Sequence, residues 1–114
     1  MAAPEATNFA DATDIREFPH GRAEIVELGG GEIARLTLAP GWKWSEHVKP
    51  MAETDSCQVA HFQYIVSGRV VVEMDDGAQV ELGPGDVGLV PPGHDAWVVG
   101  EEECVAIDWG GIHT

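Results

Sequence analysis

The chain has 114 residues, of which 20 are acidic and six are basic, so its formal net charge at pH 7 is −14. This length predicts one domain with a single core. The excess of negative charge argues against a protein that binds nucleic acid or an anionic membrane, because both functions need lysine and arginine to neutralise phosphate.

Residues 1–20 are expected to form a loosely ordered N-terminal arm. Residues 1–14 are polar, rich in alanine and unpatterned. They have neither the basic start nor the apolar run of a signal peptide, and no later stretch approaches the roughly 20 apolar residues that span a bilayer. The sequence therefore predicts a cytoplasmic protein, in which two cysteines, Cys57 and Cys104, are too few for a disulfide scaffold.

Short strands dominate the rest of the chain. Apolar and polar residues alternate in several runs between glycine and proline turns, and no 11-residue window has the apolar spacing of a helix. About nine strands are predicted, at residues 21–28, 33–38, 42–49, 61–66, 69–74, 80–82, 87–90, 96–99 and 104–109. This pattern indicates an all-β domain over residues 21–114, a small antiparallel β-barrel with room for one small ligand.

Three of the five histidines are candidate metal ligands. His20 and His113 lie beside turn or terminal residues and are expected on the surface. His47, His61 and His94 each lie at the start of a predicted strand or directly after a turn, so their rings could meet at one end of the barrel. The simpler alternative is that each is an isolated polar residue whose hydrogen bonds go to the backbone.

The strand alternation around His61 selects further candidates. If His61 points inward, Gln63 does too, while Tyr64 points outward. Cys57 lies four residues before His61 and would share its face in an extended chain. Imidazole is the commonest transition-metal ligand and a thiolate adds softness, although a lone cysteine is also a common small buried residue.

Two stretches resemble the motifs of the cupin family. The segment from Gly41 to Lys49 resembles the first half of the first motif, and His61 to Gly68 resembles its second half, with His61 in place of the usual glutamate. The segment Gly85 to Gly93 resembles the second motif. The resemblance covers about residues 22–109 and implies a cupin-type jelly-roll, also called a double-stranded β-helix. Cupins commonly form dimers, so the resemblance also implies a dimer.

The chain departs from the cupin pattern at the expected ligands. Lys49 replaces the second histidine of the first motif, and Cys57 occupies that register when it is counted back from His61. The loop 50–58 would then fold Cys57 back beside His47. In the second motif the histidine position falls on Ala96, and His94 lies two residues earlier on the same face.

The predicted ligand set is therefore His47, Cys57, His61 and His94, with Cys57 as the uncertain fourth. It suits one divalent transition metal ion, best Zn²⁺, with Fe, Ni, Mn or Cu as alternatives. Lys49 and Gln63 are the candidates for orienting a small-molecule substrate.

The outward parity of the aromatic side chains predicts a homodimer. Four aromatic residues are predicted to point away from the histidines and outward from the barrel: Trp42, Trp44, Tyr64 and Trp97. They would leave an apolar patch on the surface unless a second copy of the chain covers it.

Three functions remain open at this stage. The first is a metal-dependent enzyme of oxygenase, isomerase or lyase type. The second is a non-catalytic cupin that binds or senses a ligand. The third is a metal-free acid–base enzyme in which His61 or His94 carries the proton.

Overall fold

The computed structural model describes residues 3–109, so the predicted surface position of His113 lies outside the described part of the chain. The described part has nine strands, a 3₁₀ turn and two one-turn helices. In chain order these are η1 (Phe9–Asp11), β1 (Asp14–Phe18), β2 (Gly21–Leu28), β3 (Gly31–Leu38), α1 (Trp44–His47), α2 (Lys49–Ala52), β4 (His61–Ser67), β5 (Arg69–Met74), β6 (Gln79–Leu82), β7 (Val87–Val90), β8 (His94–Val99) and β9 (Cys104–Asp108).

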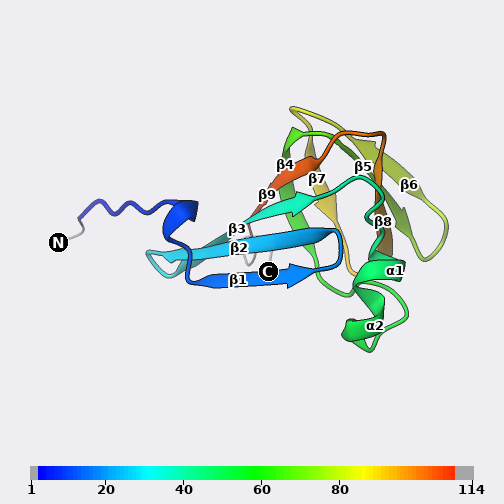
Figure 1. Ribbon diagram of the computed structural model, residues 1–114, viewed down its shortest axis with the longest axis horizontal. Coiled ribbons are helices and arrows are strands. Elements are labelled where there is room, and N and C mark those ends of the chain that lie inside the picture. Colours follow the sequence, from blue (N-terminus) through cyan, green and yellow to red (C-terminus); the bar gives the residue numbers. More distant parts are fainter. Residues whose placement is uncertain (1–2, 110–114) are drawn as a thin grey trace.

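The strands form two sheets, which confirms the prediction of an all-β antiparallel fold of jelly-roll type. One sheet has six strands in the order β1-β2-β3-β9-β4-β7, and the other has three in the order β6-β5-β8 (Figure 1). Ile65 and Ala106 from the larger sheet and Val72 and Val98 from the smaller sheet belong to one buried apolar cluster. The core therefore lies between the sheets.

The N-terminal segment contains a strand, where the sequence analysis expected a loose arm. Residues 14–18 form β1 and pair with β2 along their whole length. The β2–β3 hairpin and η1 extend away from the two-sheet body, which gives the molecule extents of 48 × 29 × 29 Å (Figure 1). The sequence did not predict this strand because four of its five positions are exposed, so its residues do not form one apolar and one polar face.

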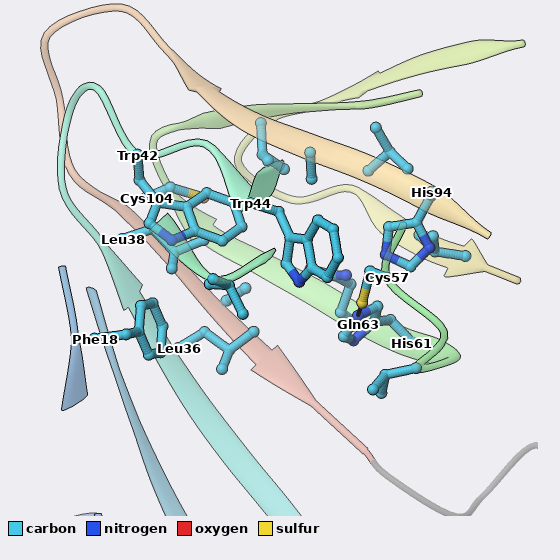
Figure 2. A pocket seen from close by; sticks show the side chains of 17 residues that line it. Phe18, Leu36, Leu38, Trp42, Trp44, Cys57, His61, Gln63, His94 and Cys104 are labelled. Carbon is cyan, nitrogen blue, oxygen red and sulfur yellow. Dashed lines mark hydrogen bonds between the residues drawn. The ribbon is translucent and has the colours of Figure 1, made fainter. Parts of the chain in front are cut away.

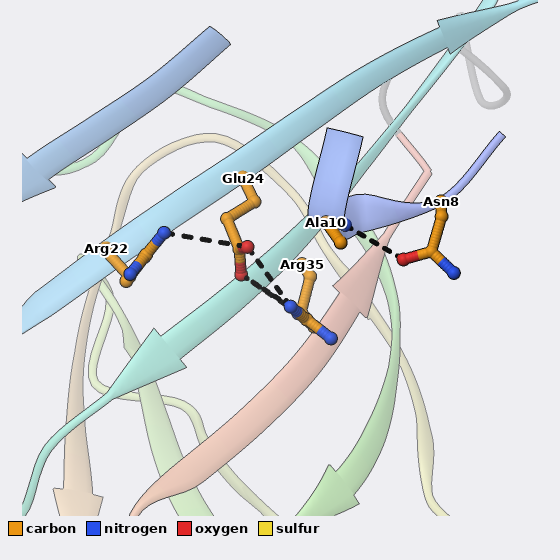
Figure 3. Close-up of polar contacts among 5 residues, drawn as sticks. All are labelled: Asn8, Ala10, Arg22, Glu24 and Arg35. Carbon is orange, nitrogen blue, oxygen red and sulfur yellow. Dashed lines mark hydrogen bonds and ion pairs between the residues drawn. The ribbon is translucent and has the colours of Figure 1, made fainter. Parts of the chain in front are cut away.

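A set of charged side chains joins the strands of this extension. Glu24 on β2 is opposite Arg35 on β3. The Arg35 guanidinium donates hydrogen bonds of 2.9 and 3.1 Å to the two Glu24 oxygens, and Arg22 lies 3.6 Å from the same carboxylate (Figure 3). The bidentate geometry and the third charge satisfy Glu24 although it is only 7% exposed.

Residues 42–49 do not form the extended run that the sequence predicted. They enter two one-turn helices, α1 and α2, joined at Val48, and Trp44, Val48 and Ala52 face the core. Their four-residue spacing is a helical signal, but the apolar template of a helix misses it because its i+3 position is the polar His47. No helix within residues 3–109 has the length and apolar character needed to cross a membrane.

The outward placement of two tryptophans was also wrong. Trp42 and Trp44 are 7% and 6% exposed and lie in the core cluster. The helical turn at α1 breaks the strand parity on which that prediction depended. Tyr64 does face outward, as predicted, with 39% of its surface exposed.

Candidate metal centre

Cys57, His61 and His94 converge at one end of the space between the sheets. One ligand atom from each residue lies within 4.8 Å of the other two. His61 is the first residue of β4, His94 is the first residue of β8, and Cys57 belongs to the loop between α2 and β4. Figure 2 shows the three side chains pointing toward one another. The structure therefore brings together three of the four predicted ligands.

The backbone fixes Cys57 beside His94. The Cys57 N–H donates to the His94 carbonyl at 2.7 Å, and the His94 N–H donates back to the Cys57 carbonyl at 3.2 Å. The loop is anchored further by a 3.0 Å hydrogen bond between the Ser56 hydroxyl and Asp75. The loop therefore folds Cys57 toward His94, and not toward His47 as the sequence analysis expected.

Both imidazoles are held so that Nε2 is the nitrogen left for a ligand. The His94 Nδ1–H donates to the Pro91 carbonyl at 2.8 Å, because a carbonyl oxygen can only accept. The His61 Nδ1 is bonded to the Asp108 carboxylate. The His61 Nε2 lies 3.9 Å from the Cys57 Sγ. A metal-binding histidine usually has its other nitrogen bonded to a carbonyl or carboxylate in this way.

Asp108 joins the group through its hydrogen bond with His61, and the sequence analysis missed it. It lies on β9 opposite Gln63, is 8% exposed, and has one carboxylate oxygen buried without a hydrogen-bond partner among the described residues. Its inward direction follows from the alternation of Cys104, Ala106 and Asp108, all of which are buried. The signal in the sequence was an acidic residue at a position of a core strand whose side chain points inward.

The electrostatics of the centre favour a thiolate. Burial raises the pKa of Cys57, but hydrogen bonds with His61 and His94 and with the backbone of Val59 outweigh it and lower the pKa to about 6. Burial lowers the pKa of His61, but Asp108 and Cys57 outweigh it and raise the pKa to about 9. Without a metal, the pair is therefore a thiolate beside an imidazolium at neutral pH.

The second cysteine has the opposite character. Cys104 is fully buried, and burial together with the charge of Glu102 raises the pKa of its thiol to about 11. Cys104 therefore stays a neutral thiol, and Cys57 is the cysteine suited to bind a metal.

Two of the predicted site residues lie outside the group. The His47 Nδ1 accepts a 3.0 Å hydrogen bond from the Lys43 N–H, and its ring packs 4.4 Å from the ring of exposed His20. Lys49 begins α2 and does not line the pocket described next. The helical path of residues 44–52 directs both side chains away from the three ligands.

A pocket of about 220 Å³ adjoins the three ligands. Its wall is mostly apolar, and Gln63 is the polar side chain that the sequence analysis also selected. No lysine, arginine, aspartate or glutamate is among its lining residues, which are Phe18, Leu36, Leu38, Trp42, Trp44, Val48, Cys57, Val59, His61, Gln63, Val70, Val72, Val90, His94, Ala96, Cys104 and Ala106 (Figure 2).

The fold and the site define a small cupin with a possible Cys–His–His ligand group. The family profile of the EutQ-like cupin domain matches residues 42–107, which is more than half of the chain. The chain therefore belongs to this cupin family. Among curated proteins, none matches the chain.

Solved structures agree with this fold. A protein of unknown function from Rhizobium leguminosarum is 21% identical, with a TM-score of 0.65 and coverage of 96% of this chain and 99% of that one. KdgF from Halomonas sp. is 20% identical, with a TM-score of 0.56 and coverage of 83% and 82%. A cupin-like protein from Thermotoga maritima is 16% identical, with a TM-score of 0.57 and coverage of 90% and 76%. At these identities the likeness concerns the fold alone.

Proposed function

We propose that Cys57, His61 and His94 bind one divalent transition metal ion and that the protein binds or transforms a small molecule in the adjoining pocket. The observation that carries this proposal is the convergence of three ligand atoms within 4.8 Å from three separate parts of the chain. Each of the two imidazoles has its Nδ1 engaged, and the thiol has a lowered pKa.

The donor set fits a metal in both spacing and chemistry. Zinc bonds of about 2.3 Å to sulfur and about 2.0 Å to nitrogen place tetrahedral ligands about 3.5 Å apart. The Cys57 Sγ and His61 Nε2 are 3.9 Å apart, so only a small adjustment is needed. One thiolate and two imidazoles suit Zn²⁺ best, and Fe, Ni or Cu next. Mn²⁺ fits least because it prefers oxygen ligands.

Three protein ligands leave a position open for the small molecule. A metal bound there supplies a Lewis acid that polarises an oxygen atom of the ligand or lowers the pKa of water. The chain's own residues orient the site: Pro91 and Asp108 fix the two imidazole rings, and Gln63 offers an amide to the bound molecule. The apolar wall excludes water. His47 and Lys49, which the structure places elsewhere, have no part in this proposal.

For an enzyme, the reaction would be of oxygenase, isomerase or lyase type. The alternative is a non-catalytic cupin that binds or senses a ligand. It is favoured by one observation: among residues 3–109, no lysine or carboxylate lines the pocket wall, which leaves few groups to move a proton. Incubating a bound compound with metal-loaded protein separates the two: an enzyme converts it, whereas a binding module releases it unchanged.

Metal titration tests the shared part of the proposal. Chelator-treated protein titrated with Co²⁺ should take up one equivalent and show the charge-transfer absorption of a cobalt–thiolate bond. The Cys104→Ala variant, which keeps the low-pKa thiol, should give the same spectrum. Protein that takes up no transition metal, or that binds Co²⁺ without thiolate absorption, would overturn the site. A reducing cytoplasmic location, as predicted from the sequence, would keep Cys57 available as a ligand.

We also propose a homodimer formed through the outer face of the larger sheet. Tyr64 and Val66 on β4 are 39% and 48% exposed, and Val87 and Leu89 on the edge strand β7 are 61% and 65% exposed. Tyr64 is paired with Val87 in the sheet, so the exposed apolar side chains adjoin one another. A contiguous apolar face on a small protein usually marks an interface. This face replaces the tryptophans on which the sequence prediction depended.

Sedimentation equilibrium tests the dimer. The double variant Val87→Glu and Leu89→Glu should be monomeric, because both charges would be buried without partners at the interface. Ile15→Glu is the matched control, since Ile15 is 45% exposed on β1 at the far edge of the same sheet. A wild-type chain that sediments as a monomer would contradict the proposal.

A further inference from the structure

The pocket has a second polar feature away from the three ligands. The indole Nε1–H of Trp42 is buried and has no hydrogen-bond partner among the described residues. Trp42 is 7% exposed and lines the pocket. A buried tryptophan N–H usually finds an acceptor, and a buried donor without one is costly. The atom has almost no accessible surface, so an acceptor in the pocket reaches this donor when the side chains around it shift, and the hydrogen bond then removes this cost.

The backbone holds Trp42 in place without using its indole N–H. Gly41 has a φ of +89°, and the Trp42 backbone N–H donates to the Ala39 carbonyl at 3.1 Å, as in a tight turn with Pro40 and Gly41 at its centre. The Trp42 carbonyl accepts a 3.0 Å hydrogen bond from the Val98 N–H on β8. The ring packs 6.4 Å from that of Phe18. The donor is thus positioned before any ligand arrives.

The two polar features lie at opposite ends of the pocket. In Figure 2, Cys57, His61 and His94 gather at one end, Trp42 lies at the other beside Leu38 and Cys104, and Trp44 lies between them. The nitrogen edge of the Trp42 ring is turned toward the side that Phe18 and Leu36 line. A ligand that fills the pocket would therefore meet the metal site at one end and a single fixed donor at the other.

We propose that Trp42 is a specificity-determining residue whose indole N–H donates to an uncharged oxygen acceptor, such as a carbonyl or ether, on a small and mainly apolar ligand. The assignment of the ligand's other end to the metal site rests on the proposed function. The assignment of the acceptor to Trp42 rests only on the pocket and the unpartnered donor.

The size and charge of the pocket restrict the ligand further. A cavity of about 150 Å³ holds benzene, so the volume of about 220 Å³ has room for one ring with a few additional heavy atoms. In the described part of the chain, no lysine or arginine lines the wall. A carboxylate or phosphate near Trp42 would lose its hydration without gaining a cation, which disfavours an anionic group at that end.

A matched pair of probes tests this inference in metal-free protein. Acetophenone and α-methylstyrene have nearly the same shape, but only acetophenone has a carbonyl oxygen. We expect acetophenone to bind about 5- to 10-fold more tightly, the effect of one added hydrogen bond to a buried donor. Acetophenone alone should also shift the Trp42 indole N–H resonance, which is identified by its NOE to the nearby Phe18 ring.

Variants then assign the donor. Trp42→Phe should lose the preference for acetophenone, because the carbonyl is then buried without a donor. Trp97→Phe is the matched control, since Trp97 is half-buried on β8 outside the pocket lining, and this variant should keep the preference. Equal binding of the probes by the wild type, no shift of the Trp42 resonance, a preference kept in Trp42→Phe, or a preference lost in Gln63→Leu alone would overturn the inference.

Co²⁺ titration keeps this test separate from the metal site. Trp42→Phe should take up Co²⁺ as the wild type does, which also shows that the variant has folded. If the wild type binds no Co²⁺ but still prefers acetophenone, the proposed metal site fails and the role of Trp42 stands.

Discussion

Two sets of polar side chains on the six-stranded sheet differ in how completely they are paired. On β2 and β3, Glu24 directs both carboxylate oxygens to arginine, and the Arg22 and Arg35 side chains are 44% and 39% exposed. On β9, Asp108 bonds His61 through one oxygen, and its other oxygen is buried without a partner in the described part of the chain. The first set is complete in itself, whereas the second is not.

The difference shows where chemistry is expected. A salt bridge with solvent-exposed arginines contributes little to stability, because water screens it and the side chains lose freedom. Buried polar groups with unused valences are costly unless something else binds them. The second oxygen of Asp108 is such a group, and the ligand atoms of Cys57, His61 and His94 face a pocket. The buried set therefore carries the proposed function, whereas the set around Glu24 only joins strands.

The largest expected effect is the loss of a ligand. Cys57→Ala should weaken metal binding by well over the 100-fold that loss of a supporting partner can cost, because it removes the one anionic ligand. Competition with a calibrated chelator measures the affinity. Cys104→Ala is the matched control, since the Cys104 thiol is also buried but has a raised pKa, and this variant should bind as the wild type does. Equal losses in both variants would contradict the distinction.

The next effect concerns the supporting carboxylate. Asp108→Asn should reduce metal affinity by about 10- to 100-fold, because His61 loses the charge that orients it and makes it a stronger ligand. In the other set, Glu24→Gln should leave the affinity unchanged. If the two variants weaken binding to the same extent, the effect is one of overall stability and the comparison fails.

A pH effect follows from the shifted pKa values in metal-free protein. The pKa of Cys57 is lowered from 9 to about 6, so its contribution to stability is fully present above pH 9 and is lost as pH falls to 6. The pKa of His61 is raised from 6.5 to about 9, so its contribution is fully present below pH 6.5 and is lost as pH rises to 9. The two slopes oppose each other, so the free energy of unfolding should change little between these values, and urea titrations across this range measure it.

Alkylation of Cys57 gives an independent measurement of the same pKa. In metal-free Cys104→Ala, the rate of reaction with iodoacetamide should fall about tenfold for each pH unit below 6, because only the thiolate reacts. A rate that already falls tenfold for each pH unit below 9, as for an ordinary thiol, would show that the two histidines do not stabilise the thiolate.

The smallest effect is expected for the ion pairs of Glu24, whose arginine partners are exposed. Arg35→Gln should destabilise the fold by at most about 1 kcal/mol at neutral pH. The hydrogen bonds from Arg35 hold the pKa of Glu24 below its usual range. Its stabilisation is therefore present above the ordinary glutamate pKa and disappears as pH falls through the lower folded value. Thermal unfolding of wild type and variant should converge in acid, and a difference that persists there would have another cause.

Local alternation in the sequence was enough to predict eight of the nine strands in the described part of the chain, β2 to β9, and the faces of their residues. Gln63 and Ile65 are buried while Tyr64 and Val66 are exposed, and His94 and Ala96 line the same pocket, as expected. These predictions succeed because side-chain direction along a strand depends only on neighbouring residues. The same alternation along β9 places Asp108 on the inward face with Cys104 and Ala106.

Residues 42–52 show where local reasoning failed. Their aromatic residues and Pro50 suit an extended run, but Trp44 and Val48 gain more burial from a helical turn against β8. The Ser45 N–H also finds its acceptor on β8, at Asp95, 3.0 Å away. Both contacts come from a strand some 50 residues later in the chain. Tertiary packing therefore decided that His47 would leave the ligand group.

The sequence by itself determined an all-β cupin with histidines and a cysteine near the starts of strands. Only the tertiary structure decided that Cys57, His61 and His94 meet, and that Trp42 faces the pocket with an unpartnered donor. The reason is that alternation fixes which side of a strand a residue occupies, whereas the distance between residues on different strands depends on loop paths. For Cys57, that path is fixed by reciprocal backbone hydrogen bonds with His94.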